Sequence, residues 1–167
     1  MFKGVKDRMI THSIHCPSVE LNMIWNEKVF MVEKASNINP FSSEYFCWID
    51  AGICVYRNNV PPINMVNPKK IDNLPKDKFI FSSSSNTFFD NKVTKTNYYH
   101  FISGTYIIHK NIIGKFSEIY KEYLYRLVDK NNIWTDQVIL THIYKDKKSL
   151  FYRLTNGYGL IIPYLFE

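Results

Sequence analysis

The segment Trp48-Ile49-Asp50 offers the clearest candidate chemistry in this sequence, because a carboxylate directly follows a strongly apolar run. The run Tyr45–Ile49 predicts a buried strand, and Ala51-Gly52 predict a turn after it. A carboxylate inside such a strand would lose its hydration, so we expect Asp50 at the strand's carboxyl end. In open α/β sheets, ligands bind at that edge. The alternative is that Asp50 accepts hydrogen bonds from the turn backbone.

A second acidic segment is Trp134-Thr135-Asp136-Gln137. One interpretation is structural: Thr135 caps a helix, and Asp136 favours the positive amino end of that helix. The functional interpretation places Asp136 and Gln137 in a cleft, where the carboxylate orients a sugar hydroxyl or takes a proton. The capping pattern is common, and on this segment alone it is the stronger interpretation.

A third segment, Ser103-Gly104-Thr105, lies between two apolar runs. A glycine in that position marks either a bulge or a close approach of the backbone to a ligand. Taken alone, a bulge is the simpler explanation. The segment is not a phosphate-binding loop, because GxxxxGK[ST] occurs nowhere in the chain.

Other reactive side chains form no recognisable site by spacing. His12 and His15 are three residues apart, but no second pair follows them, and GxSxG is absent. The cysteines Cys16, Cys47 and Cys54 are odd in number and contain no CxxC pair. This pattern excludes a disulfide framework and favours buried, reduced thiols.

Hydrophobic periodicity predicts the elements that position these residues. We expect a helix over Val19–Lys34, capped by Ser18, whose stripe of six residues at helical spacing is apolar except for Lys28. Further helices are expected over Asn111–Val128 and from Thr135. Strands are expected at Tyr45–Ile49, Lys78–Phe81, Tyr98–Ile102, Thr105–His109 and Leu150–Leu154, so the interleaved elements predict an α/β fold.

The two long helices supply the predicted core, namely Leu21, Ile24, Val29, Phe116, Ile119, Tyr123, Leu124 and Leu127. Two polar segments, Arg57–Asp77 with four prolines and Ser82–Asn97, are expected to be loops that border the site. We expect the first to be the least ordered internal stretch.

Length and composition predict one domain over residues 1–167 and argue against a nucleic-acid-binding protein. The net charge of +6 comes from scattered residues, of which 17 are lysines and only 4 are arginines. No apolar stretch approaches the length of a membrane span, and the amino end lacks the apolar core of a signal peptide. We therefore expect a cytoplasmic protein with no transmembrane segment.

Taken in order, the segments Trp25-Asn26-Glu27-Lys28, Asn39-Pro40-Phe41, Trp48-Ile49-Asp50-Ala51-Gly52, Ser103-Gly104 and Thr135-Asp136-Gln137 carry a family resemblance. The chain resembles the HtrL/YibB-like (WlaTC-type) glycosyltransferases of bacteria and large DNA viruses, from about Trp25 to about Phe166. The resemblance implies a GT-A-like mixed sheet flanked by helices. It also implies transfer of a sugar from a nucleotide-sugar donor to a glycan, lipid or protein acceptor, in the host cytoplasm if the protein is viral.

The resemblance further assigns roles to residues. Asp50 is expected to hold Mn²⁺ or Mg²⁺ at the donor diphosphate, and Asp136 and Gln137 are expected to be catalytic. Trp48, Ser103 and Gly104 are expected to bind substrate. Only about two dozen residues precede Trp25, so we expect a chain shortened at its amino end. That shortening favours an alternative, a non-catalytic carbohydrate-binding or interaction domain that keeps the fold.

Overall fold

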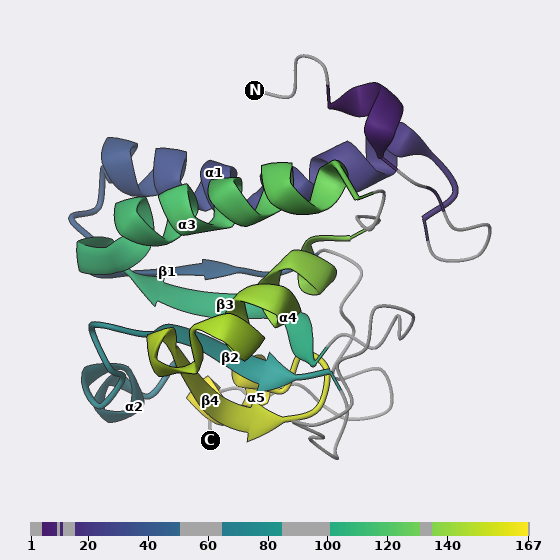
Figure 1. Ribbon diagram of the computed structural model, residues 1–167. Coiled ribbons are helices and arrows are strands. Elements are labelled where there is room, and N and C mark those ends of the chain that lie inside the picture. The colour runs from purple at the N-terminus through teal and green to yellow at the C-terminus, as the bar shows by residue number, and fades with distance from the viewer. Residues whose placement is uncertain are drawn as a thin grey trace.

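The computed structural model describes residues 5–9, 11, 16–50, 65–84, 101–130 and 135–166, and Figure 1 shows how their elements are arranged. The helices are α1 (Val19–Ile38), α2 (Pro68–Asp72), α3 (Lys110–Val128), α4 (Asp136–Asp146) and α5 (Ile161–Phe166). The strands are β1 (Tyr45–Trp48), β2 (Phe79–Ser83), β3 (Ile102–His109) and β4 (Phe151–Asn156). Two short 3-10 turns, η1 (Lys6–Arg8) and η2 (Lys148–Leu150), complete the described part.

The strands form one sheet in the order β1-β3-β2-β4. Strand β3 is antiparallel to both β1 and β2, whereas β2 and β4 are parallel. The carboxyl ends of β1, β2 and β4 therefore meet at one edge of the sheet, together with the amino end of β3 (Figure 1). The predicted α/β class, a mixed sheet flanked by helices, is confirmed.

Helices cover both faces of this sheet (Figure 1). On one face, α1, α3 and α4 bury the main core, in which Phe79 of β2 stacks on Phe116 of α3 with ring centres 4.5 Å apart. On the other face, Ile80 and Ile107 pack against Leu74, which follows α2, and against α5. Alternate residues of a strand point to opposite faces, so Gly104 and Tyr106 of β3 face α1, whereas Ser103 and Thr105 face away from it.

The two long predicted helices are confirmed, and Ser18 caps α1 by accepting a hydrogen bond from the Leu21 amide at 3.1 Å. The predicted buried stripe of α1 is wrong in part. Ile24 is 54% exposed, while Asn22 and Asn26, which lie outside the predicted stripe, are buried, as is Lys28 within it.

The buried asparagines of α1 form hydrogen bonds with each other and with the neighbouring helix α3. The Asn26 amide donates to the Asn22 side chain at 2.6 Å and accepts from the Tyr120 hydroxyl of α3 at 2.9 Å. These bonds offset the cost of burying polar groups, so the packed face of α1 turns away from Ile24. Among the other predicted core residues, Leu21 and Ile119 are half-buried and the remaining five are buried.

The strands differ from the prediction where serine and glycine occur. The residues around Ser103-Gly104 belong to one strand, β3, from Ile102 to His109, although the pairing of β3 with β2 shifts register at this point. Ser82 and Ser83 belong to β2 and are buried, although they were expected to open a loop. The Ser82 and Ser103 hydroxyls bond each other at 2.8 Å, so two buried polar side chains satisfy one another across neighbouring strands.

The two predicted loops are described only in part. Within Arg57–Asp77, residues 68–72 form the helix α2, whose first turn holds Pro68, a position that tolerates proline. Residues 57–64 of the first loop and 85–97 of the second lie outside the described residues. Cys54 and Trp134 also lie outside them. Cys16 is buried as expected, but Cys47 is exposed, so the prediction of buried thiols is wrong for that residue. Within the described chain, no helix is both long and apolar enough to cross a membrane.

Candidate functional site

Asp50 lies just beyond the carboxyl end of β1, at the edge of the sheet where ligands were expected. Its Oδ1 accepts hydrogen bonds from the indole Nε1 of Trp48, at 2.8 Å, and lies 2.8 Å from Nζ of Lys28. Its Oδ2 accepts a longer bond of 3.3 Å from the hydroxyl of Tyr158. The side chain of Asp50 is 27% exposed. A ligand can therefore reach this carboxylate.

Lys28 joins Asp50 to the second acidic residue. Its side chain, 4% exposed on α1, places Nζ 3.4 Å from Oδ2 of Asp136 as well as 2.8 Å from Asp50. The ammonium also lies 5.8 Å from the ring centre of Trp48. A buried ammonium is tolerated because two carboxylates neutralise it. We call Lys28, Asp50 and Asp136 the carboxylate–lysine cluster.

Asp136 is the buried member of this cluster, at 1% exposed. It is the first residue of α4, and Thr135 both caps that helix and donates a hydrogen bond of 2.9 Å to Oδ1 of Asp136. Burial raises the pKa of Asp136, and the nearby Asp50 adds to this shift, while Lys28 and Thr135 oppose it. Its Oδ2 receives no well-aligned hydrogen bond within the described chain, so the Lys28 ammonium is its charge partner. The structural interpretation is therefore confirmed, since Thr135 caps α4 and Asp136 is its first residue, whereas a role of Asp136 toward a sugar stays a prediction.

Because Gly104 has no side chain, the carboxylate–lysine cluster can lie directly against the backbone of β3. A Cβ at this position would stand 2.7 Å from Oδ2 of Asp50, 3.3 Å from the Tyr158 hydroxyl and 3.4 Å from Nζ of Lys28. The backbone of Gly104 is not in the left-handed region, so the glycine is needed for space and not for its conformational freedom. Of the two sequence interpretations, the bulge is supported, because the pairing of β2 with β3 shifts register between Phe81 and Ser83, opposite this glycine. A close approach of a ligand to Gly104 stays a prediction.

The other two predicted site residues, Ser103 and Gln137, form hydrogen bonds that stabilise the strands and the start of α4. Ser103 is buried on the opposite face of β3, where its hydroxyl bonds Ser82 and the Thr105 carbonyl. The Gln137 amide nitrogen donates to the Ile102 carbonyl at 2.7 Å, which ties the start of α4 to the start of β3. The structure thus gathers Trp48, Asp50, Gly104 and Asp136 around one point, but not Ser103.

Sequence reasoning missed Lys28 and Tyr158. Lys28 could have been found, because it is the one charged residue in the predicted apolar stripe of α1. Tyr158 lies between Gly157 and Gly159 in the turn after β4. These glycines have positive φ angles of 112° and 76°. Burial, with a contribution from Asp50, raises the pKa of Tyr158 to about 12. Its hydroxyl therefore stays protonated near neutral pH and donates to Asp50.

Comparison with known protein families shows that this chain is related to one of them. A family model described as a bacterial protein of unknown function, HtrL_YibB, matches residues 1–160. The chain belongs to the HtrL_YibB family. The resemblance predicted from the sequence motifs is therefore confirmed, while the family description itself assigns no activity. No curated protein and no solved structure matches the chain.

Whether this HtrL_YibB chain can bind a divalent cation depends on which side chains could coordinate the ion. Within the described ranges, no three His, Cys, Asp or Glu side chains gather in one place. The closest arrangement is the aspartate pair, and there the Lys28 ammonium already lies 2.8 Å and 3.4 Å from the two carboxylates. Because an ammonium and a divalent ion cannot share that position, the described residues do not fit a cation held by both aspartates.

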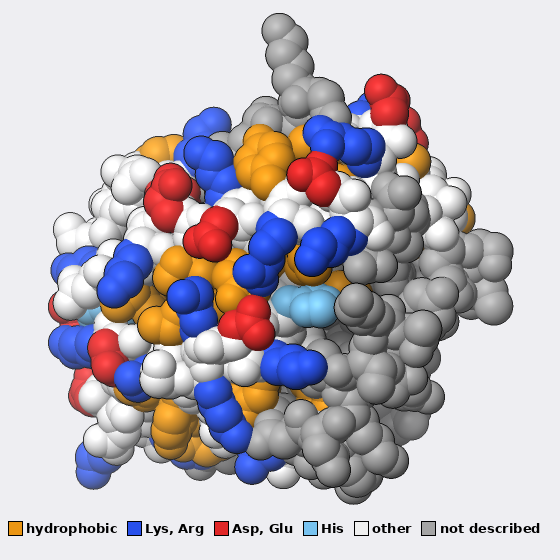
Figure 2. All heavy atoms as spheres, in the orientation of Figure 1, with side chains coloured by type: hydrophobic (Ala, Val, Ile, Leu, Met, Phe, Trp, Pro, Cys, Tyr) orange, Lys and Arg blue, Asp and Glu red, His pale blue; other side chains and the backbone are white. Residues whose placement is uncertain are grey.

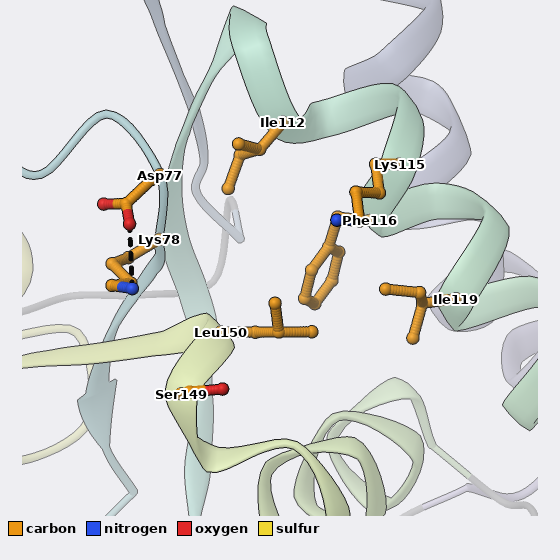
Figure 3. A pocket seen from close by; sticks show the side chains of 8 residues that line it. All are labelled: Asp77, Lys78, Ile112, Lys115, Phe116, Ile119, Ser149 and Leu150. Carbon is orange, nitrogen blue, oxygen red and sulfur yellow. Dashed lines mark ion pairs between the residues drawn. The ribbon is translucent and has the colours of Figure 1, made fainter.

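The HtrL_YibB chain also has a cavity of about 300 Å³ at the opposite edge of the sheet. Figure 3 shows its apolar floor of Ile112, Phe116, Ile119 and Leu150, with Lys78, Lys115, Asp77 and Ser149 around it. Asp77 and Lys78 precede β2, and Leu150 precedes β4, so this cavity is at the end of the strands remote from Asp50. On the face shown in Figure 2, lysines and arginines are interspersed with acidic and apolar side chains and do not form one basic patch.

Proposed function

We propose that this chain is a glycosyltransferase that moves a sugar from a nucleotide-sugar donor to an acceptor. The observation that carries the proposal is the arrangement at Asp50. A partly exposed carboxylate, an indole and a phenol hydroxyl meet at the carboxyl edge of a mixed α/β sheet. Carboxylates and hydroxyls bond sugar hydroxyls, and an aromatic ring offers an apolar face to the sugar ring. The HtrL_YibB family is described as of unknown function, so the proposal rests on this site and on the sequence motifs.

The proposed step is a single displacement with a defined proton balance. An acceptor hydroxyl oxygen attacks the anomeric carbon of the donor, and the new glycosidic bond forms there. The bond from that carbon to the diphosphate oxygen breaks, and the nucleoside diphosphate leaves with the electron pair. A carboxylate that receives the hydroxyl proton completes the balance. Asp50 is the member of the cluster whose exposure lets it contact a bound sugar.

The roles expected for Asp136 and Gln137 remain proposals. Asp136 is almost fully buried and pairs with Lys28, so we propose that it influences a ligand through Lys28 and Asp50. Direct contact with a sugar would require α4 or its neighbours to shift. In the proposed step no metal lies between the two aspartates, because the Lys28 ammonium already lies there. The Mn²⁺ or Mg²⁺ expected at Asp50 remains a prediction that the experiment below includes. The proposed setting is the cytoplasm, with a glycan, lipid or protein acceptor.

A second function is favoured by one specific observation. The burial of Asp136, together with the Gln137 amide bond to the Ile102 carbonyl, leaves Asp50 as the acidic side chain of the carboxylate–lysine cluster that a ligand can touch. A site with one accessible carboxylate and an indole is sufficient to bind a sugar without transferring it. The alternative is therefore a non-catalytic carbohydrate-binding domain.

The experiment that tests both functions combines binding with turnover. A panel of nucleotide sugars is screened by thermal shift, with Mn²⁺, with Mg²⁺ and with EDTA, and release of nucleoside diphosphate is followed in the presence of candidate acceptors. A donor at 100 times its Kd should stabilise the fold by about 2.7 kcal/mol. Asp50→Asn should remove that gain, whereas Asp72→Asn, the same change at an exposed position of α2, should not.

The outcomes separate the candidates. Binding with release of nucleoside diphosphate supports the transferase. Stabilisation by free sugars, with no release from any donor, supports the binding domain. Absence of any stabilisation by nucleotide sugars under all three metal conditions would overturn the proposed transferase activity.

A further inference from the structure

The buried ammonium of Lys28 takes the position that a metal ion would need. A divalent cation held by two aspartates requires an oxygen from each carboxylate at about 2.0–2.6 Å from the ion. In this structure, Oδ1 of Asp50 and Oδ2 of Asp136 are the oxygens that face a common point, and Nζ of Lys28 is there. The two positive centres would repel each other strongly at such a distance, because the surroundings are largely closed to water.

The surroundings also restrict where Lys28 can go. Its side chain is 4% exposed, and the backbone of β3 passes so close that a Cβ on Gly104 would lie 3.4 Å from Nζ. The indole of Trp48 lies near it on another side, with the ring centre 5.8 Å from Nζ. A lysine that withdrew to make room for a metal would leave both carboxylates and move its charge within surroundings that are largely closed to water, which is costly.

The charges of the cluster set what Asp50 can bind. One ammonium faces two carboxylates, so the cluster has no excess positive charge that would attract a diphosphate. The Asp50 carboxylate would repel a diphosphate placed against it. An uncharged sugar hydroxyl would donate a hydrogen bond to this carboxylate, beside the Tyr158 hydroxyl and the Trp48 ring.

We propose that Lys28 is the resident cation of this site, and that Asp50 binds the uncharged sugar ring of a ligand without a divalent metal. The second half of this inference rests on the proposed sugar-binding function, whereas the first half rests on the geometry of the cluster. Lys28 is then a positioning residue, since it holds the Asp50 carboxylate in place and does not itself touch the ligand.

The first test uses Mn²⁺ alone, so that it does not depend on any donor. The protein is titrated with Mn²⁺, and free Mn²⁺ is measured by electron paramagnetic resonance. We expect no stoichiometric site in the wild type. Lys28→Met, which removes the charge and keeps a similar length, should gain one Mn²⁺ site per chain, and adding Asp136→Asn should abolish that site.

Two results would overturn the inference. One is a stoichiometric Mn²⁺ site in the wild type that Asp50→Asn removes. The other is a folded Lys28→Met variant that gains no site sensitive to Asp136→Asn. Should Lys28→Met fail to unfold cooperatively in urea, the wild-type titration decides by itself.

The second test measures the sugar. For whichever nucleotide sugar or free sugar binds the wild type, the Kd should be the same in Mn²⁺ as in EDTA, within error. A loss of affinity of about tenfold or more in EDTA would contradict the inference. If no sugar binds at all, the proposed function fails while the Mn²⁺ titration still judges the role of Lys28, so the two failures are distinguishable.

Discussion

Gly104 and Asp50 are so close that the site has no room for a methyl group between them: an ideal Cβ on Gly104 would lie 2.7 Å from Oδ2 of Asp50. The contact joins the central strand β3 to the residue that follows the edge strand β1. The same carboxylate accepts hydrogen bonds from Trp48 and Tyr158 and pairs with the Lys28 ammonium, so any displacement of Asp50 disturbs three side chains at once.

Gly104→Ala should therefore shift Asp50, because the contacting atom belongs to a carboxylate that is held from several sides. We expect a loss of more than about 1 kcal/mol in the free energy of unfolding, as for overpacked sites. The indole N–H resonance of Trp48, followed by NMR, should move because its acceptor moves. Urea unfolding measures the first effect.

Gly114→Ala is the matched control, since it makes the same change in α3. A Cβ there meets only Oε1 of Glu33 at an ordinary 3.7 Å. Alanine favours a helix over glycine, so we expect a gain of about 0.5–1 kcal/mol. Equal losses from the two variants would show that Gly104 has no special packing role.

Thr135→Ala should destabilise the fold more than Ser18→Ala, although both remove a helix cap. Loss of the Ser18 cap should cost about 1 kcal/mol. Thr135 also donates to buried Asp136, and an acceptor left without that bond should cost about 1–3 kcal/mol more. Thr135→Ser, which keeps the hydroxyl, should restore most of the difference in urea unfolding. If Thr135→Ala and Ser18→Ala cost the same, the bond to Asp136 contributes nothing.

Asp136 should make the stability of the protein depend on pH in a particular direction. Burial raises its pKa in the folded state, so the folded chain binds this proton more tightly than the unfolded chain does. The resulting stabilisation is full below the unfolded value of about 4 and is lost as the pH rises through the folded pKa. The unfolding free energy of the wild type minus that of Asp136→Asn should therefore fall as the pH rises from about 4. A difference that rises over that range would contradict the raised pKa.

Leu124→Ala and Ile24→Ala test which faces of the two long helices are packed. Leu124 of α3 is buried, and its truncation should cost about 2–5 kcal/mol. Ile24 of α1 is more than half exposed, so its truncation should change stability by less than about 0.5 kcal/mol. Comparable losses from both changes in urea unfolding would place Ile24 in a core that the structure does not show.

The helices and the position of Asp50 were predictable because they follow from local patterns. A 3.6-residue period identified α1 and α3, and an apolar run with a turn after it placed Asp50 at the end of a strand. The buried face of α1 was not predictable, because the burial of Asn26 depends on the hydroxyl of Tyr120, which is 94 positions away in the sequence. Local patterns treat asparagine as exposed unless its distant partner is known.

The site itself was predictable only in part for the same reason. The burial of Ser103 could not be predicted locally, because its hydroxyl bonds the Ser82 hydroxyl of the neighbouring strand. Lys28 was recognisable as the charged residue in an otherwise apolar stripe, but only the folded chain shows that two carboxylates surround its ammonium. Tyr158 carried no local pattern that linked it to Asp50.

The bond between the Tyr158 hydroxyl and Asp50 joins residues 108 positions apart, and it has a consequence for the order of folding. Closing so long a loop is entropically costly, so this contact should form late, after the local turns of α1 and α3 are in place. Asp50 then gains its Tyr158 partner only when the turn after β4 has packed against the end of β1. In a refolding experiment, recovery of ligand binding should therefore lag behind recovery of helical circular dichroism.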